Sequence, residues 1–264
     1  EFVIRPLIFI ELSEDRVKLI NILPKSEYGS IIKPIHVKNQ SSVGITYVTS
    51  NWNVGSISMG EFKVRGHFRL QRCGKNLSEV KIVISGAGAA GTAIAKLLLV
   101  SGAENILAFH REGLAKISGI DNHGFKGDLH EALKGADVFI GVSAANILDE
   151  SDIKGMAVNS IVFALANPDP EIDPVIARKY AAVVATGRSD QPNQINNVLA
   201  FPGIFRGLLD ANAHKITDNL LVAAAQAIAE CVAPNQLNAN FIIPSVFDPA
   251  VAKQVATAVK NAAK

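Results

Sequence analysis

The residues Gly86-Ala87-Gly88-Ala89-Ala90-Gly91 have the spacing G-x-G-x-x-G, which is typical of a turn that binds a dinucleotide. The first glycine permits a tight bend, the second lets the backbone approach a pyrophosphate, and the third allows close packing of helix on strand. Backbone amides at the helix start then face the anion. The pattern alone is weak, but an apolar run precedes it and a helical pattern follows it. We therefore predict that these six residues bind the cofactor phosphates.

The residues after the next apolar run bear on the choice between NAD and NADP. An acidic residue in this place would accept hydrogen bonds from the adenosine ribose, but the chain reads Phe109-His110-Arg111-Glu112. A carboxylate would repel a 2′-phosphate, whereas His110 and Arg111 could attract one. We therefore expect these two residues to contact the cofactor, with a slight preference for NADP. The alternative is that both face water and that Glu112 binds the ribose.

The elements that must position these residues are read from the apolar runs. Runs typical of buried parallel strands lie at 80–85, 105–109, 136–142, 160–165 and 182–186, and the first is followed by a helical pattern at 92–101. Strand alternating with helix predicts an α/β fold, a doubly wound parallel sheet of the Rossmann type over residues 80–264. Ligands bind beyond the carboxyl ends of such strands, where Ser143 and Asn167 stand. Both are candidate cofactor contacts.

Three blocks in chain order carry a resemblance to a known family. They are Phe-Ala-Leu-Ala-Asn-Pro at 163–168, Ala-Thr-Gly-Arg-Ser-Asp at 185–190, and a longer block at 192–207 that begins Pro-Asn-Gln-Ile-Asn-Asn. With 81–96, 132–144 and 242–249, they make residues 80–264 resemble the NAD(P)-binding domain of bacterial-type malic enzymes. The resemblance implies oxidation of malate with NAD or NADP, loss of carbon dioxide with help from Mg²⁺ or Mn²⁺, and release of pyruvate.

The same resemblance implies roles for two asparagines. Asn167 and Asn197 match family residues that reach the substrate and the edge of the nicotinamide. An amide can donate to a carboxylate oxygen and accept from a carboxamide without titrating, so it can orient both partners. We therefore expect Asn167 to bind both substrate and cofactor, and Asn197 to bind substrate. The alternative is that each is a turn-former or a cap.

Other polar residues are given structural interpretations. Arg188 and Asp190 could form an ion pair in the site, but a paired loop arginine is more often structural, so neither is predicted to be catalytic. Four histidines have no metal-ligand spacing, and we expect lone surface residues: His110, His123, His130 and His214. A dehydrogenase of the lactate type would need a catalytic histidine in a later loop. After His130 the sequence offers only His214.

Residues 1–79 do not match the family. In the family, the lysine base, the tyrosine acid and the metal-binding carboxylates belong to a preceding domain, whose blocks Tyr-Thr-Pro-Gly and Asp-Asp-Gln-His-Gly are absent here. We therefore leave the catalytic residues unknown, find no metal ligand in this chain, and expect cofactor binding without turnover. Two explanations stay open for residues 1–72: a genuine, diverged segment, or a truncated or frame-shifted reading, which we favour. The alternative function for the chain is a non-catalytic NAD(P)-binding sensor, whose affinity for the cofactor would not change when malate is added.

The unmatched segment has a mixed or partly disordered character. It contains short β-type runs such as 45–49, without helical partners. Its end, from Lys63 to Lys75, is strongly basic, and we interpret it as a solvated linker. The alternative is an arm that binds a polyanion, for which Phe62 and Phe68 alone offer stacking.

Composition narrows the partners and the compartment. Of 264 residues, 19% are charged and the net charge is +2, so nothing favours nucleic acid or an anionic membrane surface. No apolar run is long enough to span a bilayer. Cys73 and Cys231 are too sparse for a disulfide framework, and we expect a cytoplasmic protein. Helical patterns at 220–231 and 249–263 carry apolar stripes; since the family is oligomeric, we expect a homo-oligomer in the complete enzyme.

Overall fold

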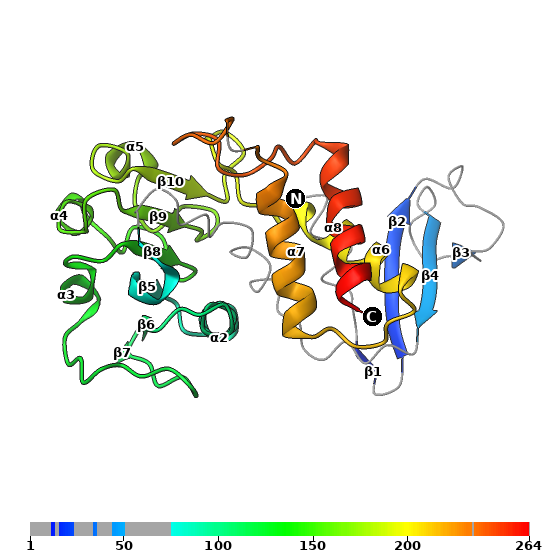
Figure 1. Cartoon of the computed structure of the whole chain (residues 1–264), viewed down its shortest axis with the longest axis horizontal. Coiled ribbons are helices and arrows are strands. Elements are labelled where there is room, and N and C mark those ends of the chain that lie inside the picture. Colours follow the sequence, from blue (N-terminus) through cyan, green and yellow to red (C-terminus); the bar gives the residue numbers. More distant parts are fainter. Residues whose placement is uncertain are drawn as a thin grey trace. The chain divides into compact units, whose positions relative to one another are not determined.

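A computed structural model describes residues 75–233 and 235–263, together with the backbone of four strands earlier in the chain (Figure 1). The chain divides into two compact units, residues 1–57 with 212–216 and residues 58–211 with 217–264. In the first unit, an antiparallel sheet has the order β1-β2-β4-β3. Its strands are β1 (Leu12–Ser13), β2 (Arg16–Leu23), β3 (Pro34–Ile35) and β4 (Gly44–Ser50). The β-type run at 45–49 lies within β4. The basic segment, apart from Lys75, lies outside the described residues.

The second unit is built on a six-stranded sheet of order β10-β9-β8-β5-β6-β7. The strands are β5 (Lys81–Ser85), β6 (Asn105–His110), β7 (Gly113–Leu114), β8 (Val138–Gly141), β9 (Ile161–Ala164) and β10 (Val183–Thr186). All pairs are parallel except β6 with β7. Each parallel strand coincides with a predicted run to within two residues at either end, and the predicted Rossmann-type sheet is confirmed. The short antiparallel β7 was not predicted.

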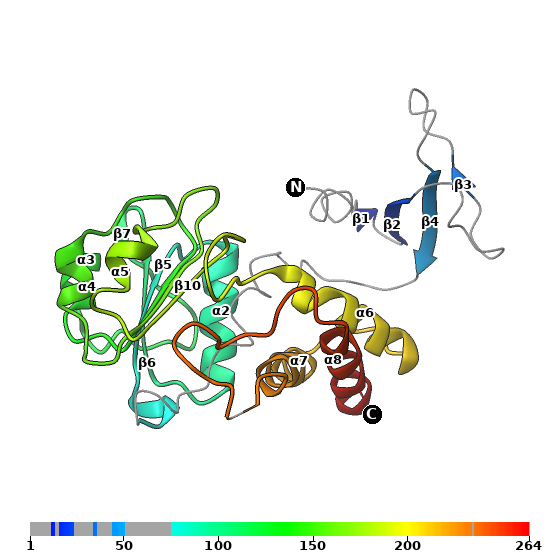
Figure 2. The same ribbon diagram turned by 90° about the horizontal axis from the view of Figure 1, so that it is seen from above.

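The strand order reverses at β5, because β6 lies on one side of it and β8 on the other. Helices cover both faces of the sheet (Figures 1 and 2). On one face lie α3 (Leu129–Leu133), α4 (Glu150–Lys154) and α5 (Pro174–Ala177), and on the other lies α2 (Ala89–Val100). Such a reversal is the place where open α/β sheets bind ligands, in the crevice beyond the carboxyl ends of the strands.

Two apolar layers hold the sheet between these helices. Val83, Phe139 and Val162 alternate with their neighbours along the strands and meet Leu133 and Ile153 of α3 and α4 in one buried cluster. On the other face, α2 buries an apolar stripe that consists of Ile94, Leu97 and Leu98. The helix begins at Ala89 rather than at the predicted Thr92, because small alanines and a glycine form its first turn.

Three longer helices complete the unit: α6 (Phe201–Asp210), α7 (Asp218–Glu230) and α8 (Pro249–Ala262). The sequence predicted α7 and α8 to within two residues, but it did not predict α6. In α6, a Cβ added at Gly203 would lie 2.5 Å from the Cβ of Val255. Gly203 therefore lets the backbone of α6 approach α8 closely. Among the described residues, no helix is both long and apolar enough to cross a membrane.

Candidate functional site

The turn between β5 and α2 is fixed by glycine and by two hydrogen bonds to β6. Gly86 has a φ of +101°, and a Cβ there would lie 2.6 Å from the carbonyl oxygen of Val142. The amides of Gly86 and Ala87 both donate to the carbonyl oxygen of Phe109, at 2.9 Å each. These two residues therefore shape the turn, and their amides are not free to bind a ligand. Ala87 is also buried.

The next residues of the fingerprint are open to a ligand. Gly88 is exposed and is the N-cap of α2, with no side chain to cap the helix. A Cβ added at Gly88 would meet nothing within 4 Å, whereas one at Gly91 would strike the carbonyl oxygen of Gly86. The first amides of a helix have no partner within it and carry the positive end of its dipole. The open space at Gly88, with the amides of Ala89 and Ala90 behind it, fits a pyrophosphate.

Ser143 lies directly beside this turn, at the carboxyl end of the neighbouring strand β8. Its hydroxyl oxygen is 2.9 Å from that of Ser85, the last residue of β5. A Cβ added at Gly86 would lie 3.0 Å from the Cβ of Ser143. The structure therefore brings this candidate cofactor contact together with the glycine fingerprint, at the reversal of strand order.

Asn167 follows β9, the next strand along the sheet. It is exposed, and its peptide bond to Pro168 is cis. The preceding amide, that of Ala166, donates to the carboxylate of Glu171 at 3.0 Å. Because β8 and β9 are parallel neighbours, Asn167 and Ser143 share one edge of the sheet. Asn167 can therefore present its amide at the same edge as the fingerprint.

Asn197 begins a short 3-10 helix, η5 (Asn197–Leu199), and its role as a cap is excluded. The cap is its neighbour Asn196, whose side chain accepts from the amide of Val198 at 3.1 Å. Asn197 is 7% exposed, and its Oδ1 is buried without a hydrogen-bond partner among the described residues. A buried acceptor without a donor costs free energy, so an acceptor in this state suits a ligand that supplies the donor.

Sequence reasoning missed two buried residues that hold the loops of this edge. Glu171 is fully buried and accepts the amide of Ser143 as well as that of Ala166. Asn193, in the loop between β10 and Asn197, donates to the carbonyl oxygens of Val184 and Ala239 and accepts from the amide of Ile242. No pattern in the sequence signals these roles, because each side chain also has a partner far away along the chain, Ser143 for Glu171 and both Ala239 and Ile242 for Asn193.

His110 and Arg111 lie at the end of β6 and in the turn to β7, and both are exposed, as is Glu112. The end of the second strand is where the adenosine ribose lies in this type of fold. The backbone therefore presents two basic side chains and one carboxylate in the region that distinguishes NAD from NADP.

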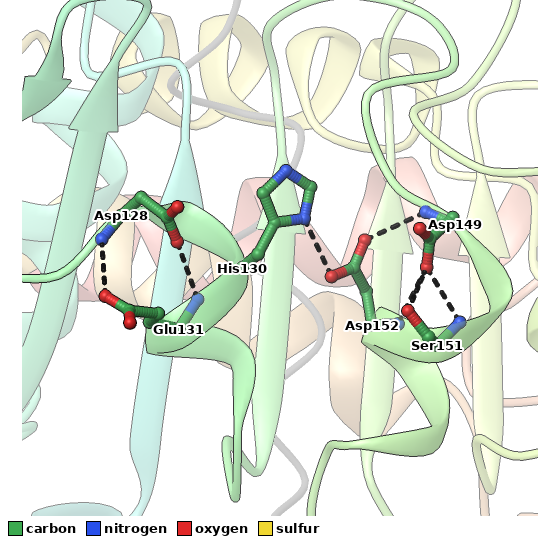
Figure 3. Close-up of polar contacts among 6 residues, drawn as sticks. All are labelled: Asp128, His130, Glu131, Asp149, Ser151 and Asp152. Carbon is green, nitrogen blue, oxygen red and sulfur yellow. Dashed lines mark hydrogen bonds and ion pairs between the residues drawn. The ribbon is translucent and has the colours of Figure 1, made fainter.

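His130 is not the lone surface residue that we expected. Its Nδ1 lies 2.8 Å from Oδ1 of Asp152, whose side chain is 5% exposed, and this hydrogen bond raises the pKa of His130 (Figure 3). Both residues belong to helix starts, where Asp128 caps α3 and Asp149 caps α4. The pair therefore joins two helices on one face of the sheet, and this contact accounts for both side chains.

The remaining polar candidates are peripheral. Arg188 and Asp190 form the expected ion pair, with nitrogen to oxygen distances of 2.8 and 2.7 Å, and this contact lowers the pKa of Asp190. His214 is exposed and has no hydrogen bond or ion pair among the described residues, which gives no support to a lactate-type site. Within the same part of the chain, no group of three or more His, Cys, Asp or Glu side chains could hold a metal ion.

Comparisons with known proteins agree with this geometry. The family model described as malic enzyme, NAD binding domain, matches residues 98–264. The NAD-dependent malic enzyme of Geobacillus stearothermophilus is 50% identical over 204 residues, which cover 72% of this chain and 42% of that protein. The NADP-dependent malic enzyme of Halomonas elongata is 39% identical over 221 residues, which cover 74% of this chain and 52% of that protein.

Solved structures give the same result. The NAD-dependent malic enzyme from Thermotoga maritima superposes with a TM-score of 0.70 at 43% sequence identity, over 76% of this chain and 57% of that one. This chain therefore spans about half the length of the relatives that it matches. The family model, at residues 98–264, covers every strand of the six-stranded sheet except β5.

Proposed function

The chain belongs to the malic enzyme family, and from this premise we propose that residues 80–264 bind NAD or NADP for the oxidative decarboxylation of malate to pyruvate. The observation that carries the proposal is the open space at Gly88, at the start of α2 and at the reversal of strand order. A dinucleotide whose pyrophosphate is bound in this space would supply the nicotinamide that takes up a hydride from the hydroxyl carbon of malate. The relatives named above use NAD and NADP, which supports this cofactor class.

We assign the protein's own residues to holding and orienting the ligands. The amides of Gly88, Ala89 and Ala90 bind the pyrophosphate, while Gly86 and Gly91 shape the turn. Ser143 and Asn167 contact the cofactor from the ends of β8 and β9. Asn197, whose Oδ1 is a buried acceptor without a donor, binds malate or the nicotinamide carboxamide.

For the choice of cofactor we propose a modest preference for NADP. His110 and Arg111 lie where the adenosine ribose binds, and cations there attract a 2′-phosphate. Arg111→Glu then weakens NADP binding more than NAD binding. Arg188→Glu, which changes charge equally on another loop, is the control and leaves the ratio of the two affinities unchanged.

The divalent metal of the family has no site among the described residues, so we derive no step through it. We also infer, from the family and from the charge of the chain, a cytoplasmic protein that forms homo-oligomers and binds neither nucleic acid nor membrane. Sedimentation at several protein concentrations tests the assembly.

A titration of the whole chain with NADP and NAD, with and without malate and Mn²⁺, tests the proposed function. Cofactor fluorescence reports binding, and absorbance at the reduced nicotinamide band reports turnover. Binding that responds to malate supports a malic enzyme site, and reduction in addition shows that residues 1–79 contribute acid, base and metal ligands. Binding that is indifferent to malate favours a sensor, and absence of cofactor binding refutes the proposal.

A further inference from the structure

Glu171 is a carboxylate buried at the carboxyl-terminal edge of the sheet, and neither the fingerprint nor the proposed ligand contacts include it. We propose that Glu171 is a positioning residue, which holds the loops after β8 and β9 in the conformation that NAD(P) binding requires. The inference rests on the proposed function, since it names how this chain keeps that cofactor site in shape.

The carboxylate of Glu171 joins the two loops by separate oxygen atoms. Its Oε1 accepts the amide of Ser143 and its Oε2 accepts the amide of Ala166, at 3.0 Å each. The side chain has no exposed surface. It also occupies the space beside Gly141, because a Cβ added at Gly141 would strike this carboxylate. The group therefore fills a site between β8 and β9 that is shaped for it.

Each of these two amides is next to a proposed cofactor contact or belongs to one. Ser143 is itself a candidate and hydrogen-bonds Ser85 at the glycine turn, and Ala166 immediately precedes Asn167. Loss of the acceptor would leave two partly buried amides without a partner, which costs free energy. One side chain thus holds the backbone at both positions, in the loops that follow two adjacent strands.

Backbone hydrogen bonds also hold residues 170–171 against the loop after β8, independently of the carboxylate. The amide of Leu148 donates to the carbonyl oxygen of Glu171, and the amide of Asn146 donates to that of Pro170, at 3.0 Å each. These backbone bonds do not depend on the side chain. A substitution at Glu171 therefore releases the amides of Ser143 and Ala166, while the backbone hydrogen bonds of Asn146 and Leu148 remain.

Burial of a carboxylate has a high desolvation cost, so stability alone would favour an apolar residue in this place. The neighbouring residue shows that alternative. Ile172 is 2% exposed and belongs to the apolar cluster under α3, α4 and α5. The contrast between two adjacent buried residues, one apolar and one ionisable, supports a role for Glu171 in shaping the loops.

The experiment compares Glu171→Gln and Glu171→Ala with Ile172→Ala in the full chain. Hydrogen exchange by mass spectrometry follows the segments around Ser143 and Ala166, and titration with NADP and NAD follows affinity. We expect faster exchange at both segments in Glu171→Ala and at one of them in Glu171→Gln, whose amide can accept only one of the two bonds. We expect affinity to fall about tenfold in Glu171→Ala and less in Glu171→Gln.

The control separates positioning from general loss of stability. Ile172→Ala removes a buried side chain beside Glu171 but leaves both amide bonds, so its affinity stays within about twofold of the wild type after correction for folded protein. Unchanged exchange in the Glu171 variants, or equal loss of affinity in all three variants, overturns the inference. A wild-type chain that binds no NAD(P) refutes the proposed function instead, and the wild-type titration alone reveals that outcome.

Discussion

Two polar regions at opposite ends of the parallel sheet, one around Asp137 and the other around Gly88 and Asn197, differ in whether the protein supplies their hydrogen-bond partners. At the amino-terminal edge, buried Asp137 accepts from Lys75 Nζ at 2.7 Å and from the Lys81 amide at 2.9 Å. At the carboxyl-terminal edge, the space at Gly88 is open and Asn197 Oδ1 lacks a partner among the described residues. Asp137 is therefore satisfied by the protein itself, although Ser160 Oγ at the same edge lacks a partner among the described residues, whereas Gly88 and Asn197 leave groups for a ligand. The difference separates residues for stability from residues for binding within one domain.

The largest expected effect is a loss of stability when Asp137, at the amino-terminal edge, is replaced. Asp137→Ala leaves the amide of Lys81 without its acceptor and Lys75 without its ion pair. Breaking such a buried contact destabilises the fold by about 2–4 kcal/mol. Chemical denaturation measures this loss, and cofactor titration below the transition should show unchanged affinity. A large loss of affinity in the folded protein would contradict the division between the edges.

Two buried asparagines at the carboxyl-terminal edge, Asn193 and Asn197, allow a structural role to be compared with a proposed binding role. Asn193→Ala removes three hydrogen bonds of a buried side chain and should cost ~2–3 kcal/mol of stability. Asn197→Ala removes an acceptor that has no donor among the described residues, so the change in stability should stay below ~1 kcal/mol. We expect only Asn197→Ala to abolish the effect of malate on cofactor binding. Equal destabilisation by the two variants would remove the contrast.

Gly88→Ala places a methyl group in the open space where the pyrophosphate is proposed to bind. It meets no protein atom within 4 Å and φ is −68°, so stability should fall by no more than about 1 kcal/mol, the cost of replacing glycine by alanine at an N-cap. Cofactor affinity should fall about tenfold, which corresponds to ~1.4 kcal/mol. The control, Gly102→Ala, is also free of contacts but has a φ of +97°. It should cost about 1 kcal/mol of stability and leave affinity unchanged.

What could be predicted from the sequence depended on how local the physical cause is. The strands are predicted by continuous apolar runs, and the fingerprint by glycines with a fixed short spacing. By contrast, Asp137 and Lys75 are 62 residues apart, and Asn193 and Ile242 are 49 apart. No single-sequence pattern links such partners. Glu171 was missed for the same reason, since its carboxylate accepts amides from two different loops, those after β8 and β9.

Helix α6 shows the opposite failure, where local propensity gives the wrong answer. It begins Phe201-Pro202-Gly203 and contains a second glycine at Gly207, and glycine costs up to about 1 kcal/mol relative to alanine in a helix. The contact with α8 nevertheless favours glycine over alanine at this position, because a Cβ at Gly207 would lie 2.6 Å from the carbonyl oxygen of Ala256. Tertiary packing therefore requires the residues that argue against a helix.

The smallest expected effect concerns His130, on the helix-covered face rather than at either edge. Asp152 raises the pKa of His130 above 6.5 in the folded protein. The charged pair therefore stabilises the fold fully below pH 6.5, and this contribution is lost as pH rises through the raised pKa. Since the imidazole is 54% exposed, solvent screening limits the effect to about 0.5 kcal/mol.

Unfolding free energies of wild type, His130→Ala and the control His214→Ala, measured from pH 5 to pH 8.5, check this prediction. The difference between wild type and His130→Ala should shrink as pH rises, whereas His214→Ala should track the wild type. Cofactor affinity should be the same in all three proteins, because the His130–Asp152 pair joins the starts of α3 and α4, and Asp152 keeps its hydrogen bond from the Asp149 amide when His130 is replaced. A pH-dependent loss of affinity in His130→Ala would show that the helix layer and the binding edge are coupled after all.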